Sequence, residues 1–157
     1  MNDRSVTHAS FVIERTYDAP PARVFAAWAD PAAKARWFGG PDEWEAAEHE
    51  LDFRVGGREI NRVRPPDGAL HTFDARYQDI VAGRRIVYSY EMYVDEQRIS
   101  VSLATVELAP ARSGTRLIFT EQAAFLDGRE NDVRREQGIR ELLANLDTEL
   151  RRAAAAA

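Results

Sequence analysis

Cysteine is absent from the 157 residues, which excludes disulfides, thiolate metal sites and cysteine nucleophiles. Long apolar runs are absent as well, since nowhere do about 18 uncharged apolar residues follow one another. The segment from Met1 to Ser10 is polar and has no apolar stretch of the signal-peptide kind. Neither a membrane span nor a signal peptide is predicted, and we expect a cytoplasmic protein of the bacterial type.

The motifs of several enzyme classes are missing too. The sequence has no Gly-x-Ser-x-Gly elbow, phosphate loop or dinucleotide fingerprint. His8, His49 and His71 lie far apart, without the spacing of metal ligands, so they are predicted to be surface or turn residues. Glu48 and Glu50 flank His49 along a predicted strand, where a solvated face is expected. No catalytic residues, no metal and no cofactor are predicted.

Basic residues are fewer than acidic ones: the chain has 21 Lys and Arg and 26 Asp and Glu, which gives a formal net charge of -5. A phosphate backbone is held by positive charge, so no nucleic-acid partner is expected, and no membrane partner either. The hydrophobic content of 45% suits one ordinary core in a chain of 157 residues. A single domain over 1–157 is predicted, with its core at about 9–152.

What is present is an ordered series of secondary-structure signals. A β-prone segment at 8–18 precedes two helices that begin at prolines. The first helix carries Val24 and Trp28 on one face, and the second is capped by Asp30 and ends at Trp37. Six β-prone segments follow, separated by five turn signals. These turn signals lie at 55–57, 65–68, 82–83, 94–97 and 110–114. Connections this short favour antiparallel pairing in a meander.

Alternation along the strands predicts which face is covered. Two sets of alternate residues are largely apolar: Ile86, Tyr88, Tyr90 and Met92, then Leu117, Phe119, Glu121 and Ala123. Between Ile99 and Leu108 the alternation changes phase near 104–105, which predicts a β-bulge or a strong bend there. A curved sheet is therefore expected.

The last segment has the periodicity of a long amphipathic helix. Its apolar residues recur at spacings of three and four, namely Ile139, Leu142, Leu143, Leu146 and Leu150. Gly138 interrupts this pattern, and a glycine inside a helix lowers its stability by about 1 kcal/mol relative to alanine. We expect Gly138 to mark the closest approach of the helix to the sheet.

Short motifs sharpen this picture. They are, in chain order, PPARVFAAWADP at 20–31, WFGGP at 37–41, FRVGGR at 53–58, DG at 67–68, RIV at 85–87 and GTRL at 114–117. Over about residues 11–150 the chain resembles the START-like or SRPBCC superfamily, and within it the proteins similar to the activator of heat-shock protein 90 ATPase. Two positions depart from many relatives: Ile139 replaces a tryptophan, and Ala75 replaces a glycine.

The resemblance implies a helix-grip (START-like, Bet v-like) α+β fold. In that fold a curved antiparallel sheet of six to seven strands, with two short helices, surrounds a long C-terminal helix, and a cavity lies between sheet and helix. The residues then expected to bind a ligand are Trp37, Phe38, Phe73, Tyr77, Tyr88, Tyr90, Met92, Phe119, Glu121, Phe125, Gly138 and Leu142. Plain core packing is the alternative for each aromatic residue. For Trp37, which the family places near the cavity mouth, the alternative is a hydrophobic anchor for its helix.

Glu121 shares a strand face with Leu117 and Phe119 and is therefore predicted to point into the cavity. An unpaired carboxylate there would have a raised pKa and could donate a hydrogen bond to a ligand. The alternative is a salt bridge that lowers the pKa. The candidate partners for that bridge are Arg76, Arg98, Arg135 and Arg140.

Three functions are consistent with this reading. The expected one is binding of a small apolar or aromatic molecule without converting it. An enzyme of the cyclase, dehydratase or hydrolase type, using a pocket acid such as Glu121, is the first alternative. A co-chaperone that stimulates a heat-shock protein ATPase is the second, and it is disfavoured because the eukaryotic activators carry an additional N-terminal domain. The oligomeric state stays open, with a homodimer as one alternative.

Overall fold

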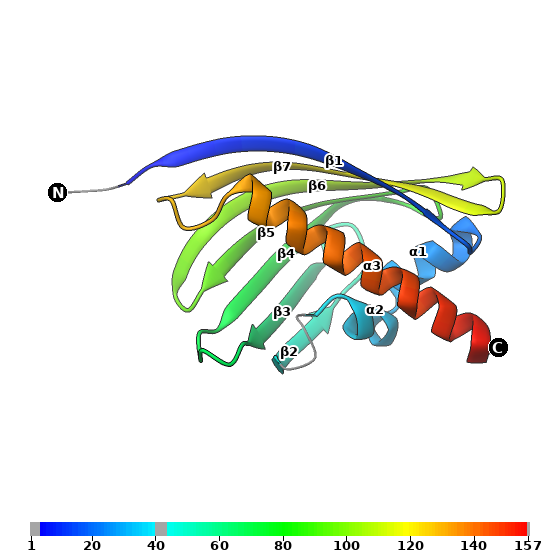
Figure 1. Ribbon diagram of the computed structural model, residues 1–157, viewed down its shortest axis with the longest axis horizontal. Helices are drawn as coiled ribbons and strands as arrows, with labels where there is room; N and C mark the ends of the chain where they lie inside the picture. Colours follow the sequence, from blue (N-terminus) through cyan, green and yellow to red (C-terminus); the bar gives the residue numbers. More distant parts are fainter. Residues whose placement is uncertain (1–3, 40–43, 157) are drawn as a thin grey trace.

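The computed structural model describes residues 4–39 and 44–156. One antiparallel sheet of seven strands curves around a long C-terminal helix, α3 (Asp132–Ala156), and two short helices lie beside the C-terminal half of α3 (Figure 1). The predicted helix-grip α+β fold is confirmed. Among the helices of the described residues, none is both long and apolar enough to cross a membrane.

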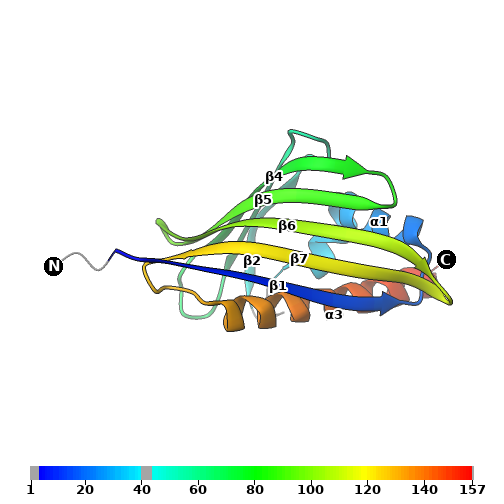
Figure 2. The ribbon, with the colours of Figure 1, turned by 90° about the horizontal axis from the view of Figure 1, so that it is seen from above.

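The sheet contains the predicted meander and the first strand predicted at 8–18. Its members are β1 (Val6–Tyr17), β2 (Glu45–Leu51), β3 (Arg58–Arg64), β4 (His71–Val81), β5 (Arg85–Val94), β6 (Gln97–Ala111) and β7 (Gly114–Leu126). Strands β2 to β7 pair in chain order, and β1 returns to pair with β7, so the order is β1-β7-β6-β5-β4-β3-β2. Seen from above, α3 runs beneath the sheet along its β1 side (Figure 2).

The short helices begin where the sequence places proline. These are α1 (Pro21–Ala29) and α2 (Pro31–Trp37), and both have proline in the first turn, where its missing N–H costs nothing. The Asp30 carboxylate accepts a hydrogen bond from the Ala33 N–H at 2.9 Å and so caps α2. The two predicted helices are therefore confirmed.

The core lies between the inner face of the sheet and the three helices. Among its most enclosed apolar members are Ile13, Val24, Trp28, Ile86, Val106, Leu117, Leu143 and Leu146. Polar contacts fix the helices on this core: the Tyr17 hydroxyl donates to the Leu143 carbonyl at 2.8 Å. Two nitrogens of Arg36 in α2 donate to the Glu149 carboxylate of α3, at 2.8 and 2.9 Å. These contacts thus join α3, near the end of the sequence, to β1 and α2, near its beginning.

The phase change predicted at 104–105 is wrong. Pairing of β6 with β7 runs without a register shift, and the irregularity lies at Ile99, where β6 pairs with β5. Beyond it, Ser100 and Ser102 face inward, whereas Leu103 faces outward and is 38% exposed. The alternation predicted the wrong phase because these inward serines belong to a buried polar cluster. Polar residues are therefore buried here, whereas the apolar Leu103 is exposed.

Gly57, in the β2–β3 turn, approaches the backbone closely. A Cβ atom there would overlap the carbonyl oxygen of Asp52 and lie 2.9 Å from that of Arg54. Because backbone atoms cannot yield as side chains do, we predict that Gly57→Ala lowers the free energy of unfolding by about 3 kcal/mol. Gly39→Ala is the control, since a Cβ at Gly39 meets nothing within 4 Å. Equal stability of the two variants in denaturant unfolding would contradict this account.

Candidate functional site

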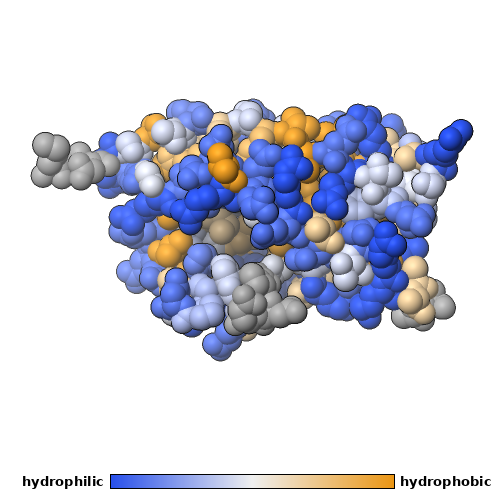
Figure 3. Space-filling view, viewed as in Figure 1, coloured by the Kyte–Doolittle hydropathy of each residue, from blue (hydrophilic) through white to orange (hydrophobic). Residues whose placement is uncertain are grey.

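A cavity of about 640 Å³ lies between the inner face of the sheet and α3. Figure 3 shows it as a hollow with apolar atoms at its floor and hydrophilic residues around it. The apolar part of its wall comprises Trp28, Trp37, Phe38, Trp44, Val63, Phe73, Tyr88, Tyr90, Met92, Phe119, Ile139, Leu142 and Leu143. The volume lies within the range of about 300–1,000 Å³ typical of small-molecule pockets.

Most of the residues predicted as ligand contacts meet at this wall. They are Trp37, Phe38, Phe73, Tyr88, Tyr90, Met92, Phe119, Gly138 and Leu142. The other three, Tyr77, Glu121 and Phe125, are buried but do not line the cavity. Tyr77 and Glu121 belong to two buried polar clusters, and the Phe125 ring centroid lies 5.3 Å from the Arg135 guanidinium carbon.

The aromatic wall is held by edge-to-face contacts. Ring centroids lie 4.8 Å apart for Trp28 and Trp37, 5.4 Å for Trp37 and Phe38, and 4.9 Å for Phe38 and Phe73. Trp37 is 1% exposed, and its indole N–H donates to the Ala27 carbonyl at 2.9 Å. Trp37 therefore lies in the cavity wall and not at its mouth, and it anchors α2 as the alternative interpretation proposed.

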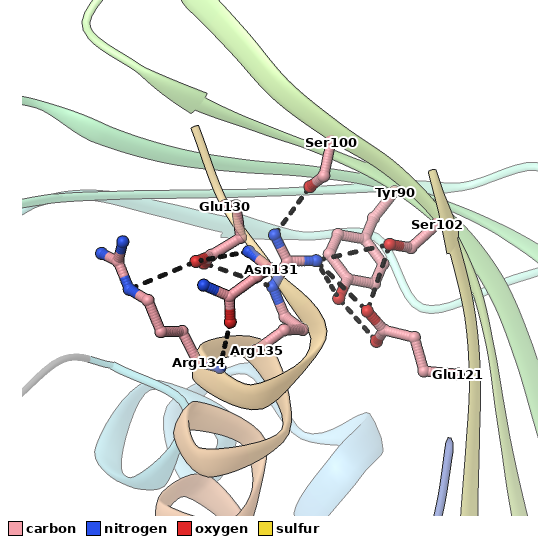
Figure 4. A network of polar contacts seen from close by, with 8 residues as sticks. All are labelled: Tyr90, Ser100, Ser102, Glu121, Glu130, Asn131, Arg134 and Arg135. Atoms are coloured by element: carbon pink, nitrogen blue, oxygen red, sulfur yellow. Dashed lines mark hydrogen bonds and ion pairs between the residues drawn. The ribbon is translucent and has the colours of Figure 1, made fainter. Parts of the chain in front are cut away.

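The first polar cluster surrounds Glu121 (Figure 4). Glu121 points inward as predicted and is 0% exposed, but it is not unpaired. Arg135, in the first turn of α3, places a guanidinium nitrogen 3.2 Å from the carboxylate. The hydroxyls of Tyr90 and Ser102 donate to Glu121 at 2.6 and 3.2 Å. Of the four arginines considered as partners, Arg135 is the one that the structure selects.

Arg135 connects this cluster to the cavity. Its other terminal nitrogen donates to Ser100 at 2.7 Å, and the nitrogen near Glu121 also donates to the Tyr90 hydroxyl at 3.0 Å. Arg135 and Tyr90 line the cavity, whereas Glu121 does not. Burial raises the pKa of Glu121, while Arg135 and the two hydroxyl donors oppose the rise. The predicted direction of the pKa shift is thus correct, although the carboxylate is ion-paired.

The second polar cluster, around Glu59 of β3, escaped the sequence analysis. Lys34 of α2 and Glu59 are both 0% exposed, and the Lys34 Nζ lies 2.7 Å from a Glu59 carboxylate oxygen. The Tyr77 hydroxyl donates to the same oxygen at 2.7 Å. His49 Nε2 lies 2.9 Å from the other oxygen. His49 is therefore directed toward the buried Glu59, and its prediction as a surface or turn residue is wrong.

Aromatic rings enclose the Lys34 ammonium group. It lies 4.0 Å from the ring centroid of Phe38 and 5.2 Å from that of Trp28, within range of cation–π attraction. Burial lowers the pKa of Lys34, and the neighbouring Glu59 opposes this. Burial alone would raise the pKa of Glu59, but Lys34, together with hydrogen bonds from His49 and Tyr77, lowers it to about 2. In the sequence, the available signal for a buried Lys34 was its spacing from Trp37, because residues three apart lie on one helix face.

Gly138 does not mark a close approach, so that prediction is wrong. A Cβ atom at Gly138 would meet nothing within 4 Å, and Gly138 lines the cavity. The helix stands away from the sheet at this point because the cavity separates them. Glycine here preserves cavity volume and does not relieve a clash.

The cavity wall is mainly apolar and suits binding more than catalysis. The buried carboxylates Glu59 and Glu121 do not line it, and each is engaged by a cation and by hydrogen-bond donors. Glu130, Arg134 and Glu141 add charged groups to the polar part of the lining. Within 4–39 and 44–156, no three His, Asp or Glu side chains group as metal ligands would.

The Lys34–Glu59 pair predicts a pH-dependent stability. Because folding lowers the pKa of Glu59 from 4.5 to about 2, the pair stabilises the fold fully above about pH 4.5 and loses this effect as the pH falls toward 2. We predict that Glu59→Gln, which leaves Lys34 buried without a counter-charge, costs about 3–5 kcal/mol at pH 7. The difference from the unaltered protein should shrink on acidification. Urea unfolding between pH 2 and pH 7 measures it, and a pH-independent difference would contradict the pairing.

Gly138 allows a second stability test. Gly138→Ala adds a helix-favouring residue where there is open space, so we predict a gain of about 1 kcal/mol in the free energy of unfolding. Thermal unfolding followed by circular dichroism is sufficient to measure it. A loss of stability would show that the helix does approach the sheet closely.

Comparisons with other proteins agree with this architecture. A family model described as Activator of Hsp90 ATPase homolog 1-like protein matches residues 18–151. An uncharacterized protein from Rhizobium leguminosarum is 50% identical with a TM-score of 0.91, over 95% of this chain and 98% of that one. A protein from Rhizobium loti is 49% identical with a TM-score of 0.85, over 92% and 99% of the two chains.

More distant structures share the fold alone. The solution structure of an AHSA1-like protein from Aeromonas hydrophila is 21% identical with a TM-score of 0.70, over 93% of this chain and 94% of that one. Among curated proteins, the sequence has no match. The family model covers most of the chain, and the chain therefore belongs to the family of activator of Hsp90 ATPase homolog 1-like proteins.

Proposed function

We propose that the protein binds a small apolar or aromatic molecule in the cavity between the sheet and α3 and holds it without converting it. The observation that carries this proposal is the aromatic wall around about 640 Å³ of space. Burial of apolar ligand surface contributes about 25 cal/mol per Å², and aromatic rings at 4.5–7 Å add to this by edge and stacking contacts. A flat, apolar molecule can pack its faces and edges against such aromatic rings.

The arrangement of charge supports binding over catalysis. A pocket acid needs a carboxyl group that can reach the bound molecule. Glu121, the acid considered for an enzyme, is separated from the cavity by Tyr90 and Arg135, which do line it. Its oxygens accept hydrogen bonds from Tyr90, Ser102 and Arg135. This cluster positions α3 on the sheet and leaves no free proton donor on Glu121.

The test uses 2-isopropenylnaphthalene, a neutral hydrocarbon probe, and isothermal titration calorimetry. We predict binding to the unaltered protein, and a loss of about tenfold in affinity, or about 1.4 kcal/mol, in Gly138→Leu. The leucine would project into the cavity, where Gly138 leaves space for it. Gln137→Leu is the matched control, because Gln137 is the adjacent residue on the exposed face of α3.

Two results would count against the proposal. One is the absence of any heat of binding with the unaltered protein up to the solubility limit of the probe. The other is an equal loss of affinity in Gly138→Leu and Gln137→Leu, which would place the probe on the helix surface.

A further inference from the structure

Tyr88 lies on the inner face of β5 between the two buried polar clusters. Its ring centroid is 5.8 Å from that of Tyr77 on one side and 5.8 Å from that of Tyr90 on the other. The Tyr77 hydroxyl donates to Glu59 and the Tyr90 hydroxyl donates to Glu121. The Tyr88 hydroxyl differs from both, because it makes no hydrogen bond with any residue that the structure describes.

Tyr88 borders the cavity and is nearly enclosed. The side chain is 2% exposed and belongs to the cavity wall. In the described part of the chain, Trp28 Nε1 is the one fully enclosed side-chain nitrogen or oxygen without a partner, so the Tyr88 oxygen retains accessible surface. Buried hydroxyls are almost always hydrogen-bonded. A hydroxyl of the cavity wall without a partner among the described residues therefore indicates where the polar group of a ligand would lie.

The charges around Tyr88 favour a neutral group at this point. The Lys34 ammonium lies 5.9 Å from the Tyr88 ring centroid, but it is paired with Glu59, as Arg135 is paired with Glu121. Burial raises the pKa of Tyr88 well above its usual value, with Tyr90, Glu121 and Glu59 adding to the effect. The phenol stays protonated and can donate. An anion here would lie close to two carboxylates, and the neighbouring cations Lys34 and Arg135 are already paired with them.

We infer that the Tyr88 hydroxyl is the donor that orients the bound molecule, and that this molecule is neutral, largely aromatic and carries a carbonyl-type acceptor such as a ketone, ester or amide. A phenol donates more strongly than it accepts, since one oxygen lone pair is delocalised into the ring. The inference rests on the proposed function, because it specifies the class of ligand for the same cavity.

The test compares two probes of one shape, 2-acetylnaphthalene and 2-isopropenylnaphthalene, in which a CH₂ group replaces the carbonyl oxygen. We expect Tyr88→Phe to weaken binding of the ketone about five- to tenfold, the usual effect of one hydrogen bond, and to leave the hydrocarbon unchanged. Tyr93→Phe is the control, since Tyr93 is on the same strand, bonds to Glu91 and does not line the cavity. Tyr88→Phe should not lower the melting temperature, because no hydrogen bond to any of the described residues is lost.

The outcomes separate this inference from the proposed function. If both probes bind the unaltered protein and Tyr88→Phe changes neither affinity, the donor role is wrong while cavity binding stands. If neither probe binds the unaltered protein, the proposed function fails and the donor role fails with it. A lowered melting temperature in Tyr88→Phe with an unchanged ratio of the two affinities would mean that the hydroxyl has a partner inside the protein, which also overturns the inference.

Discussion

Two carboxylates on the inner face of the sheet are fully enclosed, and each lies beside a cation that offsets the cost of burying its charge. Lys34 of α2 pairs with Glu59 of β3, and Arg135 of α3 pairs with Glu121 of β7. Removing any one of these partners leaves a buried charge uncompensated, so the pairs determine where the two helices sit on the sheet. Long side chains span each contact, and the helix backbone is therefore held away from the strands. The cavity occupies the space between the two anchoring points.

The same pairs determine the chemical character of the cavity. Both carboxylates lie outside the lining, and each is paired with a cation. The wall therefore presents mainly aromatic rings to a bound molecule. Gly138 contributes by leaving out a side chain where the helix faces the cavity. Within this apolar lining, the Tyr88 hydroxyl is a free donor among the residues described, and the Tyr88 ring centroid lies 5.8 Å from those of Tyr77 and Tyr90.

Periodic patterns predicted the fold well, and side-chain partners poorly. The helices at proline steps, the meander and the inward face of Glu121 follow from local signals of spacing and alternation. The partner of Glu121 could not be chosen from four arginines, because pairing depends on how α3 lies across the sheet. Glu59 and Lys34 were missed since charged residues are expected at the surface, and the error at 104–105 had the same origin. Gly138 was misread because a glycine in a helix can indicate either contact or open space.

Ligand uptake by the cavity has a direct reporter in Met92. The chain contains 2 methionines, Met1 and Met92, and Met92 lines the cavity. In protein labelled with ¹³C at the methionine methyl groups, a neutral naphthyl ketone bound against the aromatic wall should shift the Met92 methyl resonance through its ring current. The account predicts a saturable shift of that resonance during titration. A Met92 methyl signal that keeps its position up to the solubility limit of the ketone would contradict it.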